Sequence, residues 1–198
     1  MHGILQRLRE LLQRIRNILI EPRREWPLIA AEPGGVRRVL RYVAILALVP
    51  AICGYVGSTY VGTEVSAGRF HDALPTGIIK AILSYLLSFA IVFLTALAAD
   101  AIAPLFGGKR SFVNALKLTA YSYTPVWLVG VALLIPGLRF VTLLSLYALR
   151  LLWTGLPPLM GPERRKVIYY AVAIAAIAFV IVFALAIIQA AIMVLLFG

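Results

Sequence analysis

Five long apolar stretches run through this chain of 198 residues, and their length is the strongest constraint on its fold. A helix of roughly 20 apolar residues crosses the ~30 Å hydrocarbon layer of a bilayer. Hydrophobic residues make up 62% of the chain and charged residues only 14%, which is more apolar surface than a soluble domain of this size could bury. We therefore predict an all-α integral membrane protein, a five-span transmembrane helical bundle. The predicted spans are residues 39–61, 77–103, 112–135, 138–160 and 167–197.

Basic residues predict the orientation of the spans, because short cytoplasmic loops of membrane proteins are enriched in Lys and Arg. Nine arginines lie before the first span or within its first turn, and the connectors after the second and fourth spans are also basic. The opposite side has only Arg69, Lys80 and Arg139 near the span ends. We therefore predict an N-inside, C-outside protein of the cell inner (cytoplasmic) membrane. Its predicted parts are a cytoplasmic interfacial segment, residues 1–37, and a five-helix transmembrane domain, residues 38–198.

Residues 3–20 are predicted to form a basic amphipathic helix ahead of the first span. Their leucines and isoleucines recur at helical spacing, while arginines, glutamines and Glu10 fill the other face. Such a helix suits the headgroup layer of an anionic membrane, although a partner protein or a second copy of the chain could also cover its apolar face. Pro22 should end the helix, because proline cannot donate a backbone hydrogen bond. The residues predicted to bind the membrane surface are Arg7, Arg9, Arg14, Arg16 and Trp26.

Charge and motif content argue against nucleic-acid binding and against catalysis. The net charge of +11 lies where the orientation rule and anionic inner-leaflet lipid would place it, so no nucleic-acid partner is expected. The histidines are only His2 and His71, and no metal-binding spacing is present. Ser84 and Ser88 lie one helical turn apart without an activating base, and a single intramembrane aspartate, Asp100, cannot form a carboxylate dyad. We predict no catalytic residue, no metal and no cofactor.

Polar residues do gather on the predicted third and fourth spans. The helical spacing places them on shared faces, and Pro125 should act as a hinge that frees the backbone carbonyl of Tyr121. Arg150 should face the hydroxyl-rich bend of the third span, because a bare charge in hydrocarbon is unfavourable. Asp100 should pair with Lys117, or with Lys109 or Arg110 in the connector. The predicted intramembrane polar cluster is Asp100, Asn114, Lys117, Tyr121, Thr124, Tyr147 and Arg150.

Small residues recur every four positions on the first span, at Gly54, Ser58 and Gly62. Rows of this kind let helix backbones approach closely. They predict tight packing inside the monomer, and the alternative is a homodimer through the first span.

The order of several longer segments resembles the bacterial branch of the Yip-one domain family, and the resemblance covers nearly the whole chain. It implies a five-helix fold with a cytoplasmic amino terminus, and the related eukaryotic proteins are associated with membrane traffic and with prenylated small GTPases. Arg150 stands where this family pattern leads us to expect an aromatic residue. The segments are "NILIEPRREWPLIAAEP", "VPAICGYVGSTYVG", "AADAIAPLFGGKRSFVNALKLTAYSYTPVWLVG" and "LYALRLLWTGLPPLMG".

Two functions are compatible with these patterns. The first is a non-enzymatic, membrane-organising or partner-binding scaffold of Yip type, whose partners are the lipid bilayer, a membrane or cytoplasmic protein, or further copies of the chain. The alternative is a small transporter or channel with a hydrated pathway between the third and fourth spans. A dry network of polar side chains between these spans would favour the scaffold, and a continuous wet cavity would favour the transporter.

Overall fold

The computed structural model describes residues 2–33, 35–65, 68–134, 141 and 143–197, which form a helical bundle with one short β-hairpin. The α-helices of the amino-terminal half are α1 (His2–Ile20), α2 (Pro22–Ala31), α3 (Val36–Leu46), α4 (Leu48–Val56) and α5 (Leu74–Ile102). Those of the other half are α6 (Phe112–Ser122), α7 (Thr124–Val129), α8 (Tyr147–Met160) and α9 (Val167–Phe197). A π-helix, η1 (Gly57–Val61), continues α4, and the 3₁₀ helices are η2 (Ala103–Phe106), η3 (Gly130–Leu134) and η5 (Arg164–Lys166).

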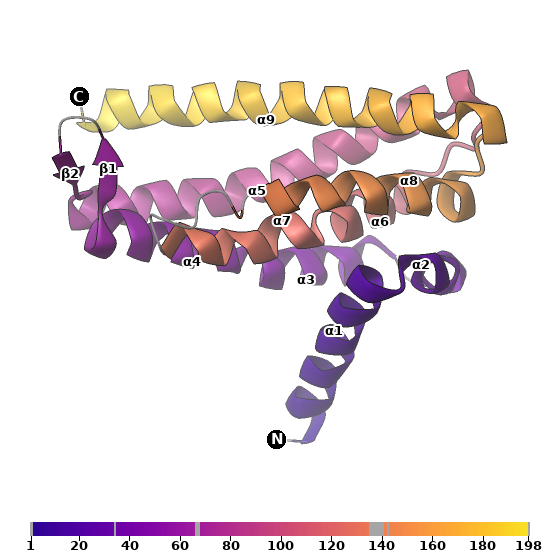
Figure 1. Ribbon diagram of the computed structural model, residues 1–198, viewed down its shortest axis with the longest axis horizontal. Helices are drawn as coiled ribbons and strands as arrows, with labels where there is room; N and C mark the ends of the chain where they lie inside the picture. The colour runs from indigo at the N-terminus through magenta and orange to yellow at the C-terminus, as the bar shows by residue number, and fades with distance from the viewer. Residues whose placement is uncertain (1, 34, 66–67, 135–140, 142, 198) are drawn as a thin grey trace.

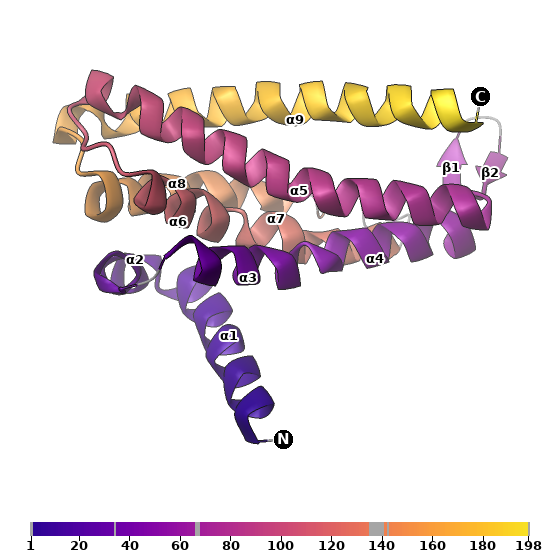
Figure 2. The same cartoon turned by 180° about the vertical axis from the view of Figure 1, so that it is seen from behind.

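The longer elements run side by side along one axis (Figures 1 and 2). Helix α2 lies across one end of the bundle, where α8 ends and α9 begins, while α1 leans away from the bundle. The opposite end holds the antiparallel hairpin of β1 (Thr63–Val65) and β2 (Gly68–Phe70), together with the C-terminal end of α9. The all-α prediction thus omitted one two-stranded hairpin, which occupies the connector between the first and second predicted spans.

Four helical stretches of the described residues are long and apolar enough to cross a membrane: Val36–Val61, Leu74–Phe106, Leu143–Met160 and Arg164–Phe197. They correspond to the first, second, fourth and fifth predicted spans. The third predicted span is helical but broken, because α6, α7 and η3 follow one another with an interruption at Tyr123. The predicted junction between the third and fourth spans, at residues 135–138, lies outside the described residues.

The amino-terminal helix is present as predicted, and it ends just before Pro22. Helix α1 stops at Ile20, and Pro22 opens α2, where a proline loses nothing because the first helical N–H has no partner within the helix. The C-terminal half of α1 packs on the protein: Ile18 is fully buried, and Leu11 and Ile15 lie against the core. Leu12 and Ile20 are instead 63% and 65% exposed.

The close packing on the first span is at Gly57, a residue outside the predicted row of Gly54, Ser58 and Gly62. A β-carbon on Gly57 would lie 2.2 Å from the backbone oxygen of Leu133 in η3, whereas one on Gly54 would meet only Leu133 Cδ1 at 3.7 Å. Side-chain atoms do not approach a backbone oxygen as closely as 2.2 Å, so the contact between η1 and η3 requires glycine at position 57.

We expect Gly57→Ala to lower the stability of the protein by about 1–3 kcal/mol, because the added methyl group forces η1 and η3 apart. Thermal unfolding in mild detergent measures this loss. Gly54→Ala is the matched control, since its methyl group would make an ordinary van der Waals contact, and it should change the unfolding temperature little. Equal unfolding temperatures for the two variants would contradict the close contact.

Candidate functional site

Trp26 fixes α2 to the end of the bundle. Its side chain is fully buried, its Nε1 donates a hydrogen bond to Thr154 Oγ1 in α8 at 3.2 Å, and its ring meets Tyr121 edge-on at 6.4 Å between centroids. Gly155 makes room for the indole, because a β-carbon there would lie 2.7 Å from Trp26 Cε2. The prediction that Trp26 anchors the chain at the membrane surface is therefore wrong: its large apolar ring is buried against α8 and α6.

Lys117 of α6 caps the C-terminal end of α2. Its Nζ donates to the backbone oxygens of Ile29 at 2.9 Å and Glu32 at 3.0 Å, and the residue is only 5% exposed. The last carbonyls of a helix have no intrahelical donor, and a cation near them also favours the helix dipole. Lys117 therefore satisfies backbone groups that belong to a segment 85 or more residues away in the chain.

The predicted pairing of Asp100 with Lys117 is wrong. Asp100 Oδ2 lies 3.5 Å from an Nη of Arg110, the connector residue that was the alternative partner, while Lys117 points to α2. Matching depth on two neighbouring helices did not bring the side chains together, because the carbonyls of α2 offer Lys117 two acceptors. The other carboxylate oxygen of Asp100 is buried and has no hydrogen-bond partner among the described residues.

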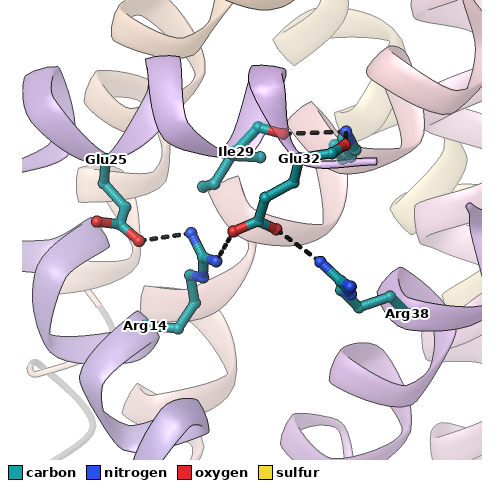
Figure 3. Close-up of polar contacts among 6 residues, drawn as sticks. Arg14, Glu25, Ile29, Glu32 and Arg38 are labelled. Carbon is teal, nitrogen blue, oxygen red and sulfur yellow. Dashed lines mark hydrogen bonds and ion pairs between the residues drawn. The ribbon is translucent and has the colours of Figure 1, made fainter. Parts of the chain in front are cut away.

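Arg14 joins α1 to both ends of α2 (Figure 3). Its guanidinium binds Glu25 Oε1 at 2.5 Å and also binds Glu32, whose other carboxylate oxygen lies 3.2 Å from an Nη of Arg38 in α3. The guanidinium also lies 6.0 Å from the centre of the Tyr121 ring. Burial by itself would lower the pKa of Arg14, but the hydrogen bond and the negative charge of Glu32 raise that pKa by a larger amount. The pKa of Arg14 therefore lies above its ordinary value, and this arginine stays charged.

These contacts separate the predicted surface arginines into two groups. Arg14 faces the protein, with a side chain 21% exposed, whereas Arg9 and Arg16 are exposed. The side chain of Arg7 lies outside the described residues. The sequence interpretation missed Glu25 and Glu32 as partners; the available signal was their spacing of seven residues, two helical turns, which puts both on the face of α2 that meets basic α1.

Local hydroxyl groups satisfy the break in the third predicted span. Pro125 lacks an N–H, and the freed backbone oxygen of Tyr121 accepts a hydrogen bond of 2.7 Å from Thr124 Oγ1. The hydroxyl of Tyr42 in α3 lies 2.7 Å from Thr124 Oγ1 and donates to it. Thr124 therefore completes the backbone hydrogen bonding of this buried bend, and Tyr42 holds the Thr124 hydroxyl in place.

Arg150 does not face this bend, contrary to prediction. It is exposed, its guanidinium carbon lies 5.4 Å from the centre of the Tyr147 ring, and it makes no hydrogen bond to α6 or α7 in the described part of the chain. Tyr147 instead donates to the backbone oxygen of Leu19 in α1 at 2.8 Å, and Asn114 Nδ2 donates to that of Leu159 in α8 at 3.0 Å. Helical spacing predicted which residues share a face, but the rotation of α8 turns Arg150 outward.

The candidate site is thus the junction where α1, α2 and α3 meet α6 and α8. It lies toward the end of the bundle that is predicted to face the cytoplasm. A groove of about 740 Å³ opens beside it, lined by charges of both signs and by apolar side chains of α1 and α3. No group of three or more metal-ligating side chains occurs within residues 2–33, 35–65, 68–134, 141 and 143–197. The side chains at this junction can form ion pairs and can contact an apolar or charged partner.

Comparison with known proteins identifies one family. The model of the Yip1 domain matches residues 16–186, from the second half of α1 into α9. Proteins of that family are generally non-enzymatic membrane proteins. Searches of curated proteins and of solved structures gave no match.

We expect Lys117→Met to destabilise the protein by about 1–3 kcal/mol, because the carbonyls of Ile29 and Glu32 lose their donor in a buried place. Asp100→Asn should cost stability separately, and the double variant should lose the sum of the two within roughly 0.5 kcal/mol, since the residues share no contact. Thermal unfolding of the three variants tests this. Lys109→Met, at an exposed lysine, is the control. A coupling energy well above 0.5 kcal/mol would support the Asp100–Lys117 pair.

Proposed function

This chain belongs to the Yip1 domain family, and on that premise we propose that it is a membrane-organising or partner-binding scaffold of the bacterial inner membrane, with α1 as its lipid-contacting element. The chain is a multi-span membrane protein, since the family match and four long apolar helices agree on this. The observation that carries the proposal is the attachment of α1: one end is fastened to the bundle, and apolar side chains remain exposed along it.

The fastening uses three different contacts. Arg14 binds Glu25 and Glu32 of α2, Ile18 is fully buried, and Leu19 accepts the hydrogen bond from Tyr147 of α8. Leu12 remains exposed on the apolar stripe, and Arg9 and Arg16 are exposed on the basic side. A helix with an apolar stripe and exposed arginines fits the boundary between headgroups and acyl chains of an anionic leaflet. The fastened end would hold this helix at a constant place beside the bundle.

We place the protein in the membrane with five crossings, in which α6, α7 and η3 together make the third. The basic connectors at residues 107–111 and 161–166 lie at the same end of the bundle as α2, which supports a cytoplasmic position for this end (Figure 1). The C-terminal end of α9 lies at the opposite end. Helix α9 has 31 residues, or about 46 Å, so it must tilt or extend beyond the hydrocarbon layer.

The polar contacts of the third and fourth crossings support a scaffold over a transporter. Asn114, Lys117 and Thr124 each bind protein groups, and Thr119 Oγ1 donates to the backbone oxygen of Ala115 at 2.9 Å. Hydrogen bonds of these side chains within the protein support the scaffold, because a transporter would use such groups to line a path for its solute.

We expect α1 to be protected by lipid along its apolar stripe. In a variant whose native thiol is removed by Cys53→Ala, a cysteine at Leu12 should react slowly with a water-soluble maleimide in proteoliposomes, and a cysteine at Gln13 should react fast. Leu12 is 63% exposed in the protein, so only an additional layer can shield it. In detergent-free nanodiscs of the same lipid the difference should persist. Equal labelling of both positions would contradict the placement of α1 at the membrane surface.

We also expect the exposed arginines of α1 to enrich anionic lipid around the protein. Arg9→Gln with Arg16→Gln should reduce the enrichment of phosphatidylglycerol in nanodiscs by up to about fivefold per charge, which lipid analysis of the purified discs measures. Arg24→Gln is the control, because Arg24 is exposed on α2 and already pairs with Glu21. The same reconstituted protein should conduct no ions above protein-free vesicles, and measurable flux would favour the transporter.

A further inference from the structure

A groove runs between α8 and α9, on a face of the bundle that the contacts of α1 and α2 leave open. It consists of two adjoining cavities of about 550 and 420 Å³, which share Leu149 of α8 and Ala175 of α9. Volumes of this size are typical of small-molecule sites. The first cavity includes Arg150 and Trp153, and the second continues along α9 to Val182.

The rim of the groove is apolar and belongs to stretches that can cross a membrane. Leu146, Leu149 and Phe179 are 60%, 48% and 71% exposed. They lie within Leu143–Met160 and Arg164–Phe197, which are long and apolar enough to span a bilayer. A molecule that enters this groove therefore comes sideways from the lipid layer and not from water.

Arg150 supplies a positive charge at this groove. It makes no ion pair or side-chain hydrogen bond with any described residue, and its contact is with the Tyr147 ring. It lies 10 residues before Met160, or about 15 Å from that end of α8. A charge at this depth is unfavourable without a counter-ion or water. An anion bound in the groove would therefore stabilise Arg150.

Two hydroxyl groups form a polar spot on the wall of the second cavity. Thr95 and Ser122 are 2% and 3% exposed, and the side-chain oxygen of Ser122 has no hydrogen-bond partner among the described residues. Buried hydroxyls are normally hydrogen-bonded. Ser122 is the last residue of α6, 10 residues and about 15 Å from its start, which matches the depth of Arg150. Both polar features of the groove therefore lie at one level.

We propose that the α8–α9 groove binds one anionic phospholipid of the surrounding inner leaflet. Arg150 binds the phosphate, Ser122 and Thr95 donate to oxygens of the ester region, and an acyl chain fills the apolar cavity between Leu149 and Val182. Arg150 lies near the junction of the two cavities, so the first cavity extends from it toward the predicted cytoplasmic end, and the apolar walls of the second cavity, down to Val182, lie deeper than the cation. The site is separate from α1 and does not depend on how α1 contacts lipid.

Trp153 allows the lipid to be observed directly. It lines the groove and is 47% exposed, whereas Trp26 and Trp127 are 0% and 3% exposed, so bromine atoms on an acyl chain quench mainly Trp153. The full-length protein is reconstituted in phosphatidylcholine vesicles that contain a small fraction of brominated phosphatidylglycerol or the same fraction of brominated phosphatidylcholine. We expect stronger quenching by the anionic lipid, and loss of the quenched component in Trp153→Phe.

Arg150→Gln should reduce the preference for the anionic lipid by about fivefold, whereas Arg164→Gln, which removes an exposed charge from η5, should leave it unchanged. Ala175→Phe fills the point that the two cavities share and should also remove the preference, with retained unfolding temperature as the check on folding. Equal quenching by both lipids, equal effects of the two arginine variants, or survival of the preference in Ala175→Phe would each overturn the site. Absence of quenching by either lipid would mean that the groove is covered, for example by a second copy, and would overturn it as well. In the background of Arg9→Gln and Arg16→Gln, Arg150→Gln should still reduce the preference of Trp153 quenching for the anionic lipid, which separates this site from the role of α1.

Discussion

The hydrogen bonds from Lys117 to the last carbonyls of α2 are the contact on which the rest of this end of the protein depends. They place a buried ammonium group under a short helix that would otherwise expose unsatisfied backbone groups beside an apolar bundle. With α2 fixed in this way, Trp26 fills the space above Gly155, and Glu25 and Glu32 are positioned for Arg14. The contact of α1 with α2 therefore depends on a lysine that is distant in the sequence.

The break in the third predicted span shows the same requirement at a different place. A proline in a membrane helix leaves a carbonyl without its donor, and water is not available there to replace it. Thr124 donates the missing hydrogen bond to the backbone oxygen of Tyr121, and Tyr42 in turn binds the hydroxyl of Thr124. The hydroxyl of Thr124 in "AYSYTP" is thus explained by the backbone of its own helix.

The sequence allowed the apolar stretches, the amphipathic helix, its end before Pro22 and the free carbonyl at Tyr121 to be predicted, because each depends on local spacing or on the chemistry of one residue. Contacts between distant segments could not be predicted in this way. Lys117 binds two backbone oxygens of another segment and does not bind Asp100. The helical periodicity of a sequence contains no information on backbone acceptors in another segment. Arg150 faces outward because of the rotation of α8, which depends on the shapes of all its neighbours.

Pairing within the protein also determines which charges can contact the membrane. Arg14 is engaged by two carboxylates, so its charge is largely balanced where it stands, and the excess positive charge lies with exposed residues such as Arg9 and Arg16. The net charge of +11 already subtracts these carboxylates, so pairing leaves its size unchanged and decides only which basic residues carry the excess. Arg150 differs from Arg14, because it lies at an apolar groove and has no carboxylate partner among the described residues. An anionic lipid is the partner that we propose for it, because the rim of that groove is apolar and belongs to stretches that can cross a membrane.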